Sequence, residues 1–262
     1  MTVILIHSSK TMRTDEDIVA KYQAPKLLSK ASELAAYVSS LTTQELEKSM
    51  HLSPAMAIKT RELMKAWSVD PAHQMLAIDA FLGDIYSGLQ VAQLTLEQRE
   101  YANQHLYILS GLYGVLRPLD GIRPYRLEMG YRFADEPFKN LYSFWGRDIA
   151  ETLPSDELIV NLSAVEYTKA VLPYLPNQNI ISPKFLTLDP RTHEPKFVAV
   201  HAKIARGAFA RWMIVNEIED VAQLKEFSDL NYRFNVKLSK PNEPVFICES
   251  FGGLGLSVRL VK

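Results

Sequence analysis

The stretch His105–Tyr131 reads HLYILSGLYGVLRPLDGIRPYRLEMGY, and the interpretation of the rest of the chain depends on it. Four glycines and two prolines interrupt it more often than a regular helix tolerates. Arginines and tyrosines lie between them in a density that a plain connecting loop does not need. Two interpretations stand equally: a tight structural turn with surface arginines, or a backbone cradle for phosphate or another anion into which Arg117, Arg123 and Arg126 point.

The overall composition is that of a globular protein. The 262 residues are 47% hydrophobic and 23% charged, and a formal net charge of -1 leaves no global basic field to attract nucleic acid. We find no internal repeat, low-complexity run or flexible linker, so a single domain over residues 1–262 is expected. The apolar run Val3–Ile6 is too short for a signal or a membrane span. A cytoplasmic protein that does not bind membranes is therefore expected, as a monomer.

Apolar periodicity and start signals predict the secondary structure. Thr42 with Glu45 and Thr95 with Gln98 have the spacing of capping boxes, and Ser53-Pro54 is a helix start. Asp70-Pro71 repeats that start signal. We expect helices over 25–41, from Thr42, over 54–67, from Thr95 to Leu109, from about 146 through Leu153 and over 202–219; strands over 3–6, 158–162, 180–188 and 196–201; a strand or buried segment over 75–82; and a hairpin of 232–238 with 245–248.

Polar side chains repeatedly follow the predicted buried strands or stand at glycine turns and a helix start. In mixed sheets such ends meet in one crevice. Lys203 and Arg206 are three residues apart, on one face near the start of a helix, where cations work against the macrodipole. The residues expected to line this locally basic cleft are Lys10, Asp84, Arg117, Arg126, Glu128, Asn161, Glu166, Lys184, Lys203 and Arg206. Such a cleft suits phosphate or a nucleic-acid backbone.

Several kinds of chemistry have no motif in this chain. The single cysteine, Cys248, excludes an internal disulfide and a multi-cysteine metal site, and its place in a predicted strand indicates a buried core thiol. No two histidines have the helical spacing of a metal site, and neither a nucleophile elbow nor a nucleotide-binding glycine loop occurs. We therefore expect no metal site and no cofactor. His7, alone at a strand end, is typical of a structural hydrogen-bonding residue.

The motifs together resemble the YaaA family, named for peroxide stress resistance, over nearly the whole chain. They are Ile6-x-Ser8-Ser9-Lys10-Thr11, Phe81-x-Gly83-Asp84-Ile85-Tyr86-x-Gly88-Leu89, 109–120 with 124–130, Leu141-Tyr142-x-Phe144-Trp145-Gly146, Asn161-Leu162-x-x-x-Glu166-Tyr167 and Lys203-x-x-Arg206-Gly207. The resemblance implies a single compact α+β domain, a mixed β-sheet flanked by helices, with a basic cleft and a helix-hairpin-helix-like element. We expect that element at Leu109–Leu116.

The resemblance also implies a function: a bacterial protein that limits iron-dependent oxidative damage and binds DNA, possibly distorted duplex, through the cleft. The alternative is an enzyme acting on a small phosphorylated or carboxylated metabolite, with Lys10, Glu128 and Glu166 as catalytic candidates. Direct iron binding is a third, weaker reading. The residues expected to bind DNA or a small anion are Lys10, Gly111, Gly114, Arg117, Arg123, Arg126, Lys184, Lys203 and Arg206, supported by Asp84, Tyr86, Tyr125, Asn161, Ser163 and Tyr167.

Overall fold

The fold is built around β1 (Thr2–His7), all six residues of which are buried. The computed structural model describes residues 1–14, 22–70, 73–175 and 179–253. β1 lies between β5 (Leu106–Ser110) and β8 (Leu158–Asn161), parallel to both. Its apolar, β-branched run suits a central strand that is covered on both faces. The strand predicted over 3–6 is therefore confirmed as the centre of the main sheet.

That sheet has five strands in the order β6-β5-β1-β8-β9. β6 (Gly114–Leu116) is antiparallel to β5, and β9 (Ile180–Ile181) is parallel to β8. Along the chain, β1 is followed by β5 and β6 on one side of it and then by β8 and β9 on the other side. This reversal at β1 creates a topological switch point, where side chains at the carboxyl ends of neighbouring strands face an open crevice.

A second sheet has four strands in the order β11-β10-β13-β12. Its strands are β10 (Lys184–Leu188), β11 (Pro195–Lys196), β12 (Tyr232–Phe234) and β13 (Val245–Cys248). β12 and β13 are antiparallel, which confirms the predicted hairpin. Phe185 and Phe246 stack at 5.5 Å between ring centroids and contact Phe209 of the long helix that covers this sheet.

Helices flank both sheets. Their bounds are α1 (Leu28–Ser40), α2 (Thr43–Met50), α3 (Pro54–Ala66), α4 (Ala77–Ala80), α5 (Asp84–Leu89), α6 (Leu96–His105), α7 (Leu141–Trp145), α8 (Asp148–Glu151), α9 (Val165–Thr168) and α10 (Ala199–Val215), with short 3-10 turns at Val91–Gln93, Leu172–Tyr174, Gln223–Glu226 and Asp229–Asn231. Both capping boxes form as predicted, at α2 and α6. The expected α+β class, with sheets flanked by helices, is confirmed; the single-domain assignment stays a prediction. No helix in the described ranges is long and apolar enough to cross a membrane.

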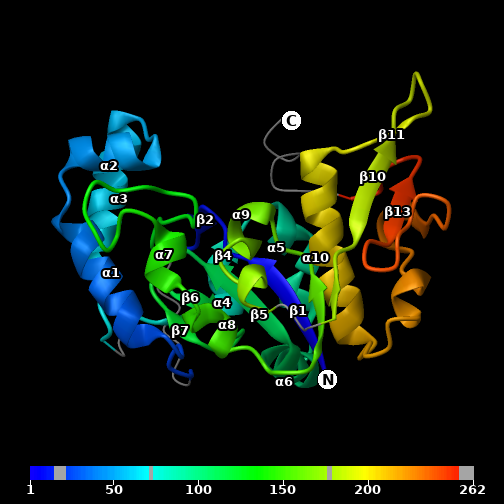
Figure 1. The fold of residues 1–262 in the computed structure, drawn as a ribbon, viewed down its shortest axis with the longest axis horizontal. Helices are drawn as coiled ribbons and strands as arrows, with labels where there is room; N and C mark the ends of the chain where they lie inside the picture. The colour runs from blue at the N-terminus through cyan, green and yellow to red at the C-terminus, as the bar shows by residue number, and fades with distance from the viewer. Residues whose placement is uncertain (15–21, 71–72, 176–178, 254–262) are drawn as a thin grey trace.

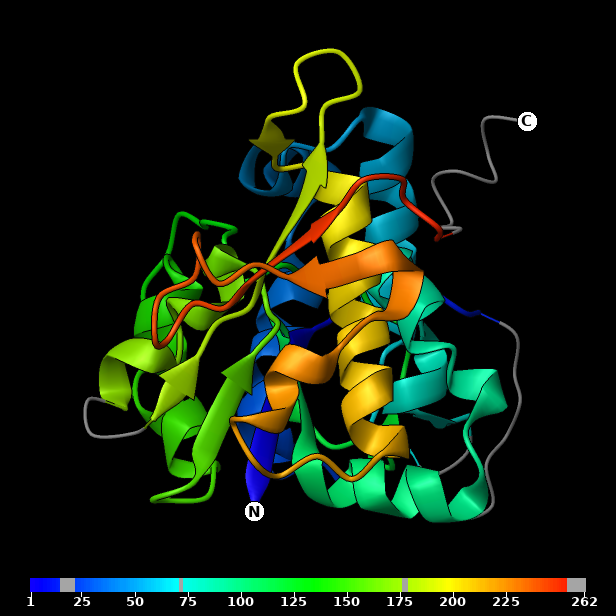
Figure 2. The same cartoon turned by 90° about the vertical axis from the view of Figure 1, so that its right-hand side faces the viewer.

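The helix α10 lies between β1 and β10 and joins the two sheets (Figures 1 and 2). It crosses α5 at Gly88 and Gly207. A Cβ at Gly207 would lie 1.8 Å from the carbonyl oxygen of Ile85, and one at Gly88 would lie 2.0 Å from that of Ile204. Only glycine permits backbones to approach this closely. The crossing holds the first turns of α10 beside the N-terminus of α5.

The segment 106–116 differs from its prediction. α6 ends at His105 and β5 begins at the next residue, so the helix does not reach Leu109. Residues 109–116 form the turn of a buried β5–β6 hairpin instead of a helix-hairpin-helix element. The helical assignment failed because a short apolar run buried on both faces has no periodicity that separates strand from helix.

Further differences concern segment boundaries. Residues 75–82 form two short strands around α4: β3 (Met75–Leu76) pairs with β7 (Gly121–Ile122), and β4 (Phe81–Leu82) pairs with β2 (Thr11–Met12). The strand expected over 180–188 is divided at Ser182-Pro183 between two sheets, because proline cannot donate to a ladder.

The strand expected over 196–201 stops at Lys196, and α10 already includes His201 and ends at Val215. α8 ends before Leu153. The start signal at Asp70-Pro71 falls partly outside the described residues.

Candidate functional site

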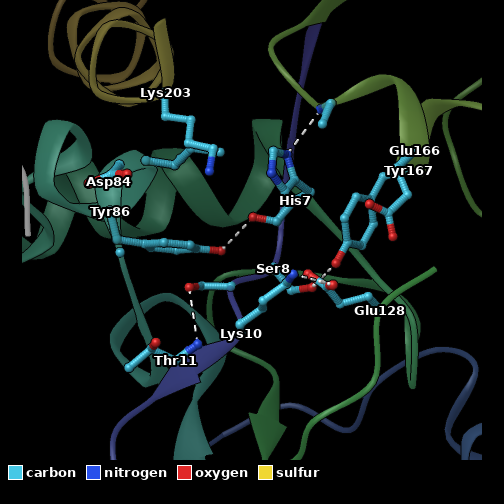
Figure 3. A pocket seen from close by; sticks show the side chains of 14 residues that line it. His7, Ser8, Lys10, Thr11, Asp84, Tyr86, Glu128, Glu166, Tyr167 and Lys203 are labelled. Atoms are coloured by element: carbon cyan, nitrogen blue, oxygen red, sulfur yellow. Dashed lines mark hydrogen bonds and ion pairs between the residues drawn. The ribbon is translucent and has the colours of Figure 1, made fainter. Parts of the chain in front are cut away.

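A cavity of about 370 Å³ opens at the carboxyl ends of β1 and β8, where the strand order reverses. Five segments that are distant in sequence meet there (Figure 3). The lining residues are His7, Ser8, Ser9, Lys10 and Thr11 at the end of β1, Gly83, Asp84, Ile85 and Tyr86 of α5 and its N-cap, Glu128, Ala164, Glu166 and Tyr167 of α9 and its N-cap, and Lys203 of α10. Seven of the predicted site residues are therefore brought together, namely Lys10, Asp84, Tyr86, Glu128, Glu166, Tyr167 and Lys203.

His7 is the buried centre of this pocket. Its ring stacks on Tyr167 at 4.8 Å between centroids, and its Nδ1 accepts a hydrogen bond of 3.1 Å from the backbone N–H of Ala164. Ser163 Oγ lies 3.3 Å from the same nitrogen. Burial, together with the charges of Arg206 and Lys203, lowers the pKa of His7 to about 3. The imidazole is therefore neutral at physiological pH, with its proton on Nε2.

Three buried phenols support the loop after β1. Tyr86 Oη donates to the carbonyl oxygen of His7 at 3.1 Å, and Ser8 Oγ donates to Tyr167 Oη at 3.4 Å. Tyr125, beneath the pocket, shares a 2.6 Å hydrogen bond with Ser110. Burial raises the pKa of Tyr125 to about 12 and raises the pKa values of Tyr86 and Tyr167 well above the usual value of a tyrosine. All three therefore remain protonated hydrogen-bonding groups.

The carboxylates of the pocket have defined partners. Glu128 Oε2 lies 2.8 Å from Lys10 Nζ, and Glu166 Oε1 accepts a hydrogen bond of 2.8 Å from the backbone N–H of Gly130. Arg126 Nη1 donates to the carbonyl oxygen of Lys10 at 3.3 Å. Arg126 thus positions the loop that presents Lys10, and Lys10 and Glu128 neutralise one another in the pocket without an added ligand.

Lys203 and Arg206 of α10 differ from Lys10, because neither has an ion-pair partner among the described residues. Lys203 lines the pocket, and Arg206 lies one turn further along the helix, close enough for its charge to act on His7. Burial lowers the pKa of Arg206. Among residues 1–14, 22–70, 73–175 and 179–253, no carboxylate forms an ion pair with either side chain. Two cations that lack an ion-pair partner in these ranges, beside a buried neutral histidine, make this side of the pocket attractive to an anion, although Asp84 and Glu166 line the same pocket.

Several predicted site residues lie elsewhere. The guanidinium of Arg117 stacks on Tyr107, 4.9 Å from the ring centroid, and Arg123 Nη1 donates to the carbonyl oxygen of Ala66 at 2.7 Å. Lys184 Nζ pairs with Glu243 Oε2 at 2.8 Å in the second sheet. Their side chains are used in structural contacts, and none of the three lines the pocket.

Gly111 and Gly114 are also in the wrong place for a surface cradle, because both are buried. A Cβ at Gly111 would lie 2.4 Å from the carbonyl oxygen of Leu127, and the carbonyl oxygen of Gly111 accepts from Trp145 Nε1. Asn161 ends β8 by accepting from the backbone N–H of Ser163 at 3.1 Å. It supports the turn before Ala164 and does not line the pocket.

Sequence reasoning left out His7, Ser8, Ser9 and Thr11 as site residues. Ser9 Oγ accepts from the backbone N–H of Thr11, and a Cβ at Gly83 would lie 2.8 Å from that oxygen. The available signal was a polar run directly after a buried strand. Within the described part of the chain, no group of three or more His, Cys, Asp or Glu residues is arranged to hold a metal ion.

Comparison with known proteins gives consistent matches. The model of a family described as peroxide stress protein YaaA matches residues 1–238. A UPF0246 protein from Salinispora tropica is 51% identical over 257 residues, which cover 98% of each chain. A UPF0246 protein from Shewanella sp. (strain MR-4) is 38% identical over 95% of this chain and 99% of its own.

Proposed function

The chain belongs to the family of peroxide stress protein YaaA, and from that premise we propose that it contributes to peroxide resistance by binding a small phosphorylated or carboxylated compound in the pocket at the carboxyl end of β1. The observation that carries this proposal is the pair Lys203 and Arg206, which have no carboxylate partner among the described residues and adjoin a cavity of about 370 Å³.

The size of the cavity supports a small ligand. Sites for metabolites occupy about 300–1,000 Å³, and a few placed polar groups fix the orientation of the ligand. Side chains from β1, α5, α9 and α10 converge in this way (Figure 3). The position at a topological switch point is also where open mixed sheets bind ligands.

The ion pair of Lys10 with Glu128 gives the site a possible acid or base. Lys10 is 55% exposed and Glu128 is 14% exposed, so an incoming anion can reach the ammonium more easily than the carboxylate. A ligand that draws Lys10 away would leave Glu128 as a general base inside the pocket. Glu166, held by Gly130, is the second candidate for that role.

DNA binding that limits iron-dependent damage is the second candidate function. Four cations, Lys10, Arg126, Lys203 and Arg206, come from three segments around one region, and phosphates of a backbone could use them. This candidate has less support, since the hairpin at 106–116 is buried and Arg117, Arg123 and Lys184 have structural contacts.

Calorimetric titration of the full chain separates the two functions. The ligands are inorganic phosphate, acetate and a short duplex oligonucleotide, each at low and high salt. We expect saturable binding of a small anion that Lys203→Ala weakens about tenfold and Lys184→Ala, the matched control, leaves unchanged. In cells challenged with peroxide, Lys203→Ala should fail to restore survival and Lys184→Ala should succeed. Duplex binding that falls steeply with salt, without binding of either small anion, would favour the second function.

A further inference from the structure

The two nitrogens of His7 have separate environments. Nδ1 accepts from the backbone N–H of Ala164 at 3.1 Å, and the ring is fixed by its stack on Tyr167. The other ring nitrogen is on the side that faces Lys203 (Figure 3). Because a backbone N–H can only donate, Nδ1 must be the acceptor, and the neutral ring carries its hydrogen on Nε2. A donor therefore points toward a cation.

Two donors that face one another need an acceptor between them. The ammonium of Lys203 carries three hydrogens and accepts none, and the guanidinium of Arg206 likewise only donates. Neither side chain has a carboxylate partner in the described ranges, and Arg206 is half-buried, which lowers its pKa. An oxyanion in the pocket could accept from Nε2–H and from Lys203, and the nearby charge of Arg206 would stabilise it.

We propose that His7 Nε2–H and the Lys203 ammonium, backed by the Arg206 charge, form a subsite for the phosphoryl group of a phosphate monoester. This subsite rests on the proposed function and names its ligand class. Two positive charges match the dianion of a phosphate monoester, whereas a single carboxylate would balance only one of them. The three terminal oxygens of a phosphoryl group also offer enough acceptors for donors from both β1 and α10.

The subsite has a defined pH behaviour. The charges that lower the pKa of His7 are those of Arg206 and Lys203, and Tyr86 of α5 and Tyr167 of α9 next to it stay protonated. The other charged groups that line the same pocket are Asp84 of α5, Glu166 of α9 and the ion pair of Lys10 with Glu128. Since the pKa of His7 is about 3, its ring does not change charge at physiological pH. Affinity for phosphate should therefore rise as the ligand forms its dianion, without the loss near neutral pH that an ordinary histidine cation would cause.

Two substitutions divide the functions of the two ring nitrogens. His7→Asn places an amide oxygen near the position of Nδ1 and keeps an acceptor for Ala164, but it removes the Nε2–H donor. His7→Gln reaches the position of Nε2 and keeps the donor. We expect His7→Asn to bind inorganic phosphate about tenfold more weakly than the wild type and His7→Gln to stay within about threefold. Thermal melting identifies any variant that fails to fold.

Nitrogen-15 NMR of the histidine-labelled wild-type chain tests the subsite without any substitution. We expect a neutral ring protonated on Nε2, with an Nε2–H resonance that moves on addition of phosphate and not of acetate. Phosphate binding without that movement, or with wild-type affinity in His7→Asn, would overturn the subsite and leave the proposed function intact. Wild-type affinity in Lys203→Ala would overturn both. Absence of binding by either small anion would overturn both.

Discussion

The stretch 105–131 and the pocket at the carboxyl end of β1 both combine glycines with cations, yet they use them differently. In 105–131, Arg117 stacks on Tyr107, and Arg123 donates to a backbone carbonyl of α3. At the pocket, Lys203 and Arg206 have no carboxylate partner among the described residues. Arginines that are held by internal contacts stabilise the fold, whereas cations without an ion-pair partner beside a cavity are available to a ligand.

The glycines of the two regions have the same structural role, which is to permit close approach of two backbones. Gly207 lets α10 cross α5, and Gly111 lets the β5–β6 turn approach Leu127. Neither position contacts a ligand in the proposed site. The difference between the regions therefore lies in their charged side chains and not in the density of glycines.

The largest expected effect is on stability. Gly207→Ala would place a Cβ 1.8 Å from the carbonyl oxygen of Ile85, and Gly111→Ala would place one 2.4 Å from that of Leu127. Backbone atoms must move in both cases, so we expect each substitution to lower the free energy of unfolding by about 3 kcal/mol or more. Denaturant unfolding measures this loss.

Gly146→Ala is the control for that pair. Its φ is 50°, but the nearest atom to an added Cβ lies 3.8 Å away. Its ψ is -123°, so the backbone lies outside the left-handed helical well, and we expect only the cost of that backbone conformation, about 1–3 kcal/mol and less than at Gly111 and Gly207. Equal losses at all three glycines would mean that close approach does not determine the two regions.

The second effect is the pH dependence of the unfolding free energy, to which Asp120 of 105–131 contributes and His7 of the pocket does not. Burial, opposed by a hydrogen bond from the backbone N–H of Arg117, raises the pKa of Asp120 to about 7 from 3.8. The folded chain therefore holds this proton more tightly than the unfolded chain. Stability from this group is complete below about pH 4 and is lost as the pH rises through about 7.

Asp120→Asn keeps an oxygen for Arg117 and removes the titration. We expect the decline in unfolding free energy between pH 4 and pH 8 to become smaller by a few kcal/mol in this variant, as measured by denaturant unfolding across the pH range. A decline of the same size in the variant and the wild type would contradict the assignment. His7→Gln should leave this part of the pH profile unchanged, since His7 is neutral throughout it.

The smallest effect separates stability from binding. Arg123→Ala removes hydrogen bonds to Ala66 O and Ser68 Oγ, so we expect a loss of about 1 kcal/mol in unfolding free energy and no change in phosphate affinity. Lys203→Ala should show the reverse. Calorimetric titration together with thermal melting of both variants gives the comparison. Weaker phosphate binding in Arg123→Ala would mean that Arg123 contributes to the binding site.

Local patterns predicted much of the fold. The apolar run of β1, both capping boxes and the β12–β13 hairpin were visible because each depends on neighbours in sequence. The change from α6 to β5 at Leu106 could not be recognised in the sequence, because a strand buried on both faces lacks periodicity. The partner of Arg123 is a carbonyl oxygen 57 residues away, which no local pattern encodes.

The candidate site was predicted in part for the same reason. Polar residues after β1 and β8 were expected to meet, and Lys10, Glu166 and Tyr167 do so. His7 was assigned a structural role because a lone histidine gives no sign of what it faces. Its position opposite Lys203 depends on the α5–α10 crossing, and the sequence marks that crossing only by Gly88 and Gly207.

Mapping of backbone amide shifts during a titration with inorganic phosphate tests the central claim most directly. We expect the shifts that saturate to cluster at 7–11, 83–86, 164–167 and 203–206, the segments that surround the pocket. The amides of 111–123 should remain unchanged at the same phosphate concentrations. Saturable shifts centred on 111–123, with none around His7 and Lys203, would contradict the claim that the pocket binds the anion and that 111–123 is its structural support.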